Sequence, residues 1–172
     1  MPQELEQPAA FEPQIRMDEE PGAGEIIRLT TAEVLETMFF TEAEPAACEH
    51  AWLPSAPCAR VRFEGSHFGE MLLAVSAEAA DPIAASFLGL DPMELTDPQR
   101  GQMIQELTNI LCGAMLSKLW PESRLAIGSP ELMPWPDWSG NGALHRCFAT
   151  PEGMLAISIR LLAASRPVGP GA

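Results

Sequence analysis

The sequence predicts an α+β domain whose helices cover one face of a mainly antiparallel sheet. Of the 172 residues, 47% are hydrophobic and 20% are charged, a composition that can build a packed core. Alternating apolar residues in 60–64 and 154–162 indicate strands with one buried face, whereas 98–119 has the apolar period of one long central helix. The predicted order is helix, two strands, two helices and three strands. Such clustering of strands favours antiparallel pairing.

The two ends of the chain differ in composition from the middle. Residues 1–25 contain seven acidic residues against Arg16, several prolines and no apolar period. Such a segment buries too little apolar surface to offset the conformational entropy lost on ordering. We therefore expect a disordered acidic tail over 1–26, a folded domain over 27–164 and a flexible end over 165–172.

The first half of the domain is predicted to be a helix followed by a hairpin. Thr30 and Glu33 have the spacing of a capping box, which predicts a helix from there to about Phe40. Residues 42–58 contain three prolines and no clean period, so we expect a loop or an irregular edge. Two strands follow at 60–64 and 68–76, joined by a turn that contains Gly65.

Asp-Pro dipeptides mark the helical part of the chain. An Asp can cap a helix whose first residue is the proline, so Asp81-Pro82 and Asp97-Pro98 predict helices over 82–89 and 98–119. After Pro121 the pattern returns to short apolar runs. These predict three strands, at 124–128, 143–150 and 154–162.

The net charge and the N-terminal residues limit the partners and the cellular location that we expect. The formal net charge of -14 repels phosphate backbones and anionic lipids, so nucleic acid and membrane surfaces are poor partners. No apolar run is long enough to span a bilayer, and the first residues lack the basic and apolar regions of a secretory signal. We therefore expect a cytoplasmic protein.

The four cysteines are far apart and form no C-x-x-C pair. The nearest approach to a metal cluster is Cys48, His50 and Cys58, but no fourth ligand stands at a recognisable offset. Free buried thiols, in a reducing compartment, and no metal site are the expectation.

The long helix carries the residues that suggest chemistry. At about 100° per residue, Ile104, Leu107 and Leu111 gather on one face, whereas Glu106 and Asn109 lie on the opposite face with Gln102 and Gly113. A glycine inside a helix costs about 1 kcal/mol relative to alanine, so close approach of another backbone is one explanation for it. The alternative is that this face is simply exposed to solvent and has no function, because E-x-x-N spacing arises by chance in many proteins.

The segment 106–113, ELTNILCG, resembles the E-x-x-N-x-x-x-G signature of the CheC/CheX/FliY phosphatases, which act on the response regulator CheY. The segment 31–38 is similar to the opening helix of the CheX branch, and the order of elements agrees over roughly 27–163. CheC-like members carry a second signature on the first helix. Here Glu33 is followed by Glu36 rather than an asparagine, so the resemblance implies one active site, as in CheX.

The resemblance implies a phosphatase for the aspartyl phosphate of a CheY-like receiver domain, terminating chemotaxis or two-component signalling. Asn109 would orient the attacking water, and Glu106 would pair with the receiver's active-site lysine. Gln102 and Gly113 would contact the partner. The protein needs no cofactor of its own in this scheme, because Mg²⁺ would belong to the receiver.

Two other functions stay open at this level. The same helix face could serve a non-catalytic, receiver-binding adaptor or a flagellar-switch-like interaction module, or the chain could be a dimeric module without a receiver partner. The resemblance implies a homodimer formed through sheet edges, for which the terminal strand 154–162 is the expected edge. The sequence identifies neither the receiver nor the role of the acidic tail.

Overall fold

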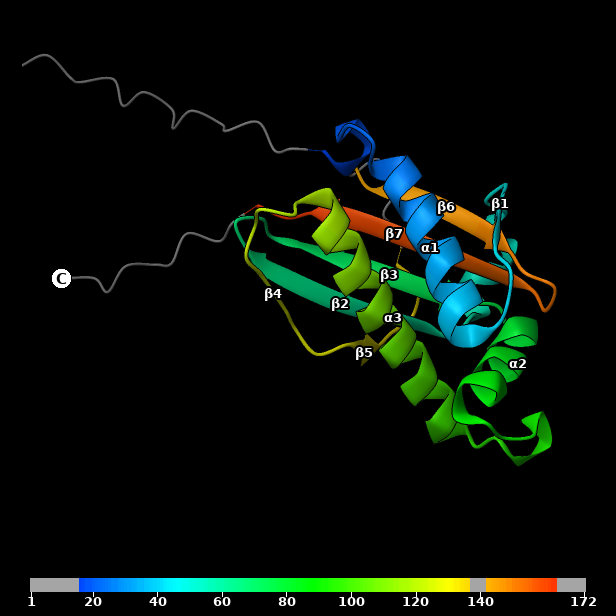
Figure 1. Cartoon of the computed structure of the whole chain (residues 1–172). Helices are drawn as coiled ribbons and strands as arrows, with labels where there is room; N and C mark the ends of the chain where they lie inside the picture. Colours follow the sequence, from blue (N-terminus) through cyan, green and yellow to red (C-terminus); the bar gives the residue numbers. More distant parts are fainter. Residues whose placement is uncertain (1–15, 137–141, 164–172) are drawn as a thin grey trace, which may run out of the picture.

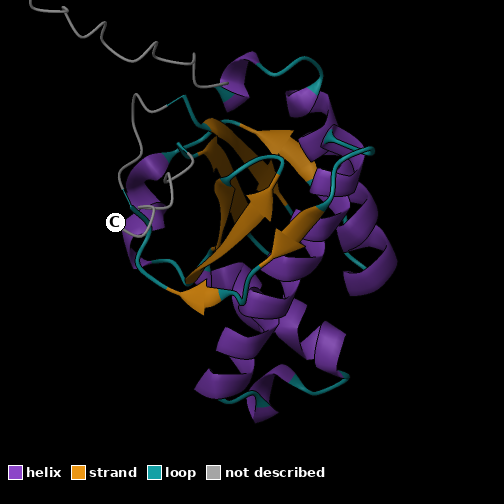
Figure 2. Ribbon diagram, turned by 90° about the vertical axis from the view of Figure 1, so that its left-hand side faces the viewer, coloured by secondary structure: helices purple, strands orange, loops and turns teal. Residues whose placement is uncertain are grey.

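The computed structural model describes residues 16–136 and 142–163. Within them the chain forms the predicted α+β fold, built on a seven-stranded antiparallel sheet whose main path runs β1-β6-β7-β3-β2-β4, with β5 also paired to β2. The strands are β1 (Glu44–Ala46), β2 (Cys58–Gly65), β3 (Gly69–Val75), β4 (Leu125–Ile127), β5 (Glu131–Leu132), β6 (Leu144–Ala149) and β7 (Met154–Leu161). The sheet is twisted, and helices flank it (Figure 2).

Three α-helices accompany the sheet: α1 (Ala23–Phe39), α2 (Ala77–Leu88) and α3 (Asp97–Leu119). In Figure 1, α1 and α3 lie side by side across the sheet and run in opposite directions. Their apolar faces meet inward-facing strand residues in the main core. That core includes Leu35, Leu107, Leu111, Leu73 and Ile157, all fully buried.

The first helix begins earlier than the sequence indicated. Thr30 and Thr31 are buried in the middle of α1, where the Thr31 hydroxyl donates to the Ile27 carbonyl at 2.7 Å, so the expected capping box at Thr30 is wrong. The N-cap is Gly22, in the left-handed conformation (φ 74°). A 3₁₀ turn, η1 (Met17–Glu19), precedes it and buries Met17 completely. The boundary predicted between residues 26 and 27 is therefore too late, because the described fold already includes residues 16–26.

This boundary gives the first testable prediction. Removing residues 1–15, which lie outside the described residues, is expected to leave the thermal unfolding midpoint unchanged, as their composition predicts. Removing residues 1–22 also deletes Met17, whose burial is worth about 2 kcal/mol, so the midpoint should fall. Thermal melts of both truncations against the full chain test this. A large loss on removing 1–15 alone would show that the acidic segment packs on the domain.

The helix caps also differ from the Asp-Pro prediction. Ser76 precedes α2, and Pro82 lies inside that helix, so the expected start at Pro82 is wrong. Thr96 caps α3 in a capping box with Gln99, one residue before the predicted Asp97. Asp81 instead forms an ion pair with Arg100 of α3. The long helix itself is confirmed almost to the residue.

The sheet topology corrects the expected dimer edge. The hairpin β2–β3 is confirmed, but β7 lies between β6 and β3 and is hydrogen-bonded on both sides. The strand 154–162 therefore cannot be an edge. The edges of the described sheet are β1, which lies in the segment predicted to be a loop or irregular edge, and β4 with β5 on the other side. Pro45 fits an edge position because it lacks a backbone donor.

The sheet face opposite α1 and α3 is divided between an apolar and a charged part. A smaller core forms around the 3₁₀ segment η2 (His50–Ser55), where Leu53 packs with Leu72 and Ala156. Beside it, the buried carboxylate of Glu70 accepts hydrogen bonds from Arg160 Nε at 2.8 Å and Arg62 Nε at 3.2 Å. This charge is paired and hydrogen-bonded, as a buried carboxylate must be.

Candidate functional site

Helix α3 presents the predicted polar stripe, defined here as Gln102, Glu106, Asn109 and Gly113. Gln102 and Glu106 are exposed, and Asn109 and Gly113 are half-buried. The opposite face of α3 is fully buried in the core through Ile104, Leu107, Leu111 and Met115, which fixes the rotation of the helix. The structure therefore brings all four predicted site residues onto one accessible face.

Glu106 and Asn109 are available to a partner. Residues three apart on a helix have Cβ atoms about 5 to 6 Å apart, so their side chains lie beside each other. Within residues 16–136 and 142–163, no hydrogen bond or ion pair engages the side chain of Gln102, Glu106 or Asn109. A carboxylate and an amide with free hydrogen-bonding capacity can together bind a cation and orient a water molecule.

The stripe lies between two flanking elements. On one side is α1, tied to α3 by the Lys118 Nζ to Glu33 Oε2 ion pair at 2.7 Å. On the other side is the segment 125–132, where Gln105 Nε2 donates to the Pro130 carbonyl at 3.0 Å. The strand predicted at 124–128 is confirmed by β4. Sequence reasoning missed β5, which is only two residues long, and the position of this segment beside α3, which depends on pairing with β2.

The position of Glu33 bears on the number of sites. Glu33 begins the α1 segment that would carry a second signature, and its carboxylate is bound to Lys118 rather than free. Glu36, at the place of the missing asparagine, cannot donate the hydrogen bonds of an amide when ionised. Both observations agree with one site, on α3.

Gly113 has room for a side chain within its own fold. A Cβ built there would lie 3.6 Å from Ile127 Cδ1, an ordinary van der Waals contact. In the part of the chain that the structure describes, the close backbone neighbour that the sequence suggested for this glycine is therefore absent. Packing within the domain does not explain why a helix-weakening residue stands in the stripe.

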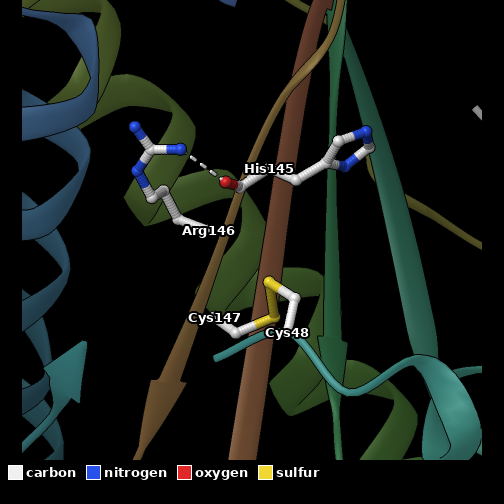
Figure 3. The surroundings of a disulfide bond; sticks show 4 residues. All are labelled: Cys48, His145, Arg146 and Cys147. Atoms are coloured by element: carbon white, nitrogen blue, oxygen red, sulfur yellow. Dashed lines mark hydrogen bonds between the residues drawn. A yellow bond between two sulfur atoms is a disulfide. The ribbon is translucent and has the colours of Figure 1, made fainter. Parts of the chain in front are cut away.

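The cysteines are not all free, contrary to the prediction. Cys48 and Cys147 form a disulfide with their Cα atoms 5.2 Å apart, joining the chain after β1 to β6 (Figure 3). Cys58 and Cys112 are free and buried, as expected, and burial raises the pKa of each thiol to about 12. The pairing was hidden from sequence reasoning because it depends on the β1–β6 register, which places Ala46 opposite Cys147.

No metal centre is found among the residues described. Cys48, part of the only cluster considered from the sequence, is consumed by the disulfide, and no group of three or more His, Cys, Asp or Glu side chains converges within residues 16–136 and 142–163. His145 lies near the disulfide, and partial burial lowers the pKa of its imidazole (Figure 3). Its neighbour Arg146 donates to the His145 carbonyl at 2.7 Å and projects to the other side of β6.

Among the described helices, none has the length and hydropathy needed to cross a membrane.

Comparisons with known proteins give one family. The family model described as "Chemotaxis phosphatase CheX" matches residues 57–134, which include the whole stripe. A search among curated proteins found no match.

Solved structures share the fold at low identity. A CheX from Desulfovibrio desulfuricans has a TM-score of 0.66 at 16% identity, covering 81% of this chain and 99% of that one. A CheC-like superfamily protein from Shewanella has a TM-score of 0.67 at 16% identity, covering 83% and 98%. CheX in a complex with CheY, BeF3 and Mg from Borrelia burgdorferi has a TM-score of 0.60 at 19% identity, covering 81% and 97%. Together, these comparisons show that residues 57–134 match the CheX family model and that the chain shares the fold of CheX-like and CheC-like proteins.

Proposed function

We propose that this protein is a phosphatase for the aspartyl phosphate of a CheY-type receiver domain. The observation that carries the proposal is the stripe on α3, where Glu106 and Asn109 are accessible, adjacent and unengaged within the described chain. The family description and the Borrelia relative, solved in a complex with CheY, support the same partner class.

The reaction replaces one P–O bond by another. A water oxygen attacks phosphorus in line with the aspartyl oxygen, which leaves as a carboxylate, and inorganic phosphate is released. The side-chain carbonyl of Asn109 accepts a hydrogen bond from this water and holds it on the attack path without adding charge beside the phosphoryl group. Positioning of this kind is the main contribution that a protein makes to phosphoryl transfer.

Glu106 supplies the partner contact. Its carboxylate, one turn before Asn109, is placed to pair with the lysine of the receiver's active site and so to hold α3 in register. Mg²⁺ bound by the receiver offsets the phosphoryl charge, which leaves no need for a metal on this chain.

The test is phosphate release from phosphorylated receivers of the same organism. A catalyst accelerates the loss of phosphate at substoichiometric amounts, with multiple turnovers. Unchanged or slowed decay, together with tight binding, would instead make the protein a non-catalytic receiver-binding adaptor. Absence of phosphorylation-dependent binding to every receiver would exclude both functions.

Gly113 gives a prediction for this surface. Gly113→Ala should fold and work, since helix propensity improves by about 1 kcal/mol and the new Cβ fits beside Ile127. Gly113→Trp should fold but block the receiver, so turnover and binding are both lost. Phosphate release and thermal melts of the two variants test this. Full activity in Gly113→Trp would show that the stripe is not the docking surface.

A further inference from the structure

We propose, on the basis of the function above, that Ile127 and Leu132 are specificity-determining residues that contact an apolar surface of the receiver beside its aspartyl phosphate. These two side chains form what we call the apolar wall, which borders the stripe on the side opposite α1. The wall would supply affinity for the correct receiver, while Glu106 and Asn109 act on the phosphoryl site.

The wall lies against α3 beside two glycines, of which only Gly101 is required for the close approach. A Cβ on Gly101 would lie 2.9 Å from Leu132 Cδ1, and one on Gly113 would lie 3.6 Å from Ile127 Cδ1. At 1.5 Å per residue these glycines are about 18 Å apart along the helix, and the rest of the stripe lies between them. The wall therefore meets α3 at both ends of the stripe.

The wall is held in place before any partner arrives. Gln105 donates to the Pro130 carbonyl at 3.0 Å, and Gly128 donates to the Arg62 carbonyl at 2.8 Å. Glu131, between Pro130 and Leu132, accepts from Arg60 Nε at 3.0 Å, and this guanidinium lowers the pKa of the Glu131 carboxyl. A surface fixed in this way loses little entropy on binding.

The wall is also exposed, although its residues are large and apolar. Ile127 is 36% exposed and Leu132 is 52% exposed. Large apolar side chains that stay exposed beside polar residues mark sites of protein–protein contact. Apolar contact is also insensitive to the net charge of -14 that would repel an acidic partner. Because Ile127 lies beside Gly113 of the stripe and Leu132 lies beside Gly101, the residue before Gln102, one occupant is expected to cover both, namely the phosphorylated receiver.

The experiment separates affinity from chemistry. Leu132→Ser and Ile127→Ser are expected to raise the KM for the phosphorylated receiver at least about tenfold while kcat changes less than about twofold. Their Kd for a receiver activated with beryllium fluoride and Mg²⁺ should rise in parallel. Leu132→Met and Ile127→Val, which keep the apolar surface, should restore both values and remain usable if a serine variant folds poorly. Met93→Ser, at a residue 93% exposed in the turn η3 (Pro92–Glu94), is the matched control and should change neither.

The outcomes distinguish the two proposals. If the folded serine variants keep the wild-type KM and Kd, the proposal that Ile127 and Leu132 determine specificity is overturned. If these variants also keep the wild-type kcat, the phosphatase proposal is unaffected. A wild-type protein that binds the activated receiver without releasing phosphate would overturn the phosphatase proposal, and the Kd of the variants would still decide on the wall. A wild-type protein that binds no activated receiver would overturn both.

Discussion

Asn109→Ala is expected to lose at least about a hundredfold in phosphate release while still binding the activated receiver. In the proposed mechanism the amide holds the attacking water, and a misplaced nucleophile costs rate rather than affinity. The contact area on α3 is almost unchanged by the truncation. Stability should also be unchanged, because no hydrogen bond within the described chain engages this side chain. Single-turnover phosphate release and binding to a beryllofluoride-activated receiver measure the two properties separately.

Glu106→Lys provides the contrast to that variant. The new ammonium would face the receiver's lysine, and like charges at an interface cost several kcal/mol, so binding and turnover should fall together. Glu94→Lys makes the same charge change at an exposed residue of η3 and should leave both intact. Wild-type turnover in Asn109→Ala would refute the catalytic assignment and leave the adaptor as the better account.

Cys48→Ser is expected to destabilise the fold by about 4 kcal/mol. The disulfide closes a separation of 99 residues, and a cross-link over so long a loop removes much conformational entropy from the unfolded chain. Reduction of the wild-type protein should lower its free energy of unfolding by a similar amount. The stability of Cys48→Ser should not change when reductant is added. Chemical denaturation with and without a thiol reductant measures both effects.

Thiol counting is the independent check on this pairing. The folded protein should label slowly at neutral pH, because Cys58 and Cys112 are buried and the pKa of each thiol is about 12. The unfolded, unreduced chain should show two thiols, and the unfolded, reduced chain four. Four thiols before reduction would contradict the Cys48–Cys147 bond.

What the sequence could predict depended on the range of the interactions. Helix α3 follows from local signals, an apolar period and a Pro near its start, and the same geometry places Glu106 and Asn109 on one exposed face. The start of α1 was missed because Thr30 imitates a cap, while burial of Thr30 and Thr31 in the core decides the actual structure. Capping propensity is worth about 1 kcal/mol, which tertiary packing readily exceeds.

Long-range pairings were beyond a single sequence. Strand β1 exists because three residues meet β6 about a hundred positions later, and the disulfide depends on that same register. The contacts of Ile127 and Leu132 with α3 likewise require the order of strands around β2 to be known. The helical cost of Gly113 is visible in the sequence, but its neighbours within the described fold leave room for a side chain and do not explain the glycine.

The central position of β7 has a consequence for assembly. With β7 paired on both sides, only the margins formed by β1 and by β4 with β5 offer free backbone in the described sheet. A second copy that added a strand beside β1 would leave α3 accessible. A copy that added beside β4 or β5 would crowd Ile127 and Leu132 and compete with the receiver. Self-association through β4 or β5 would therefore inhibit the reaction competitively, whereas self-association through β1 would leave activity unchanged. A specific activity that falls as protein concentration rises would indicate the first mode, and a constant specific activity the second.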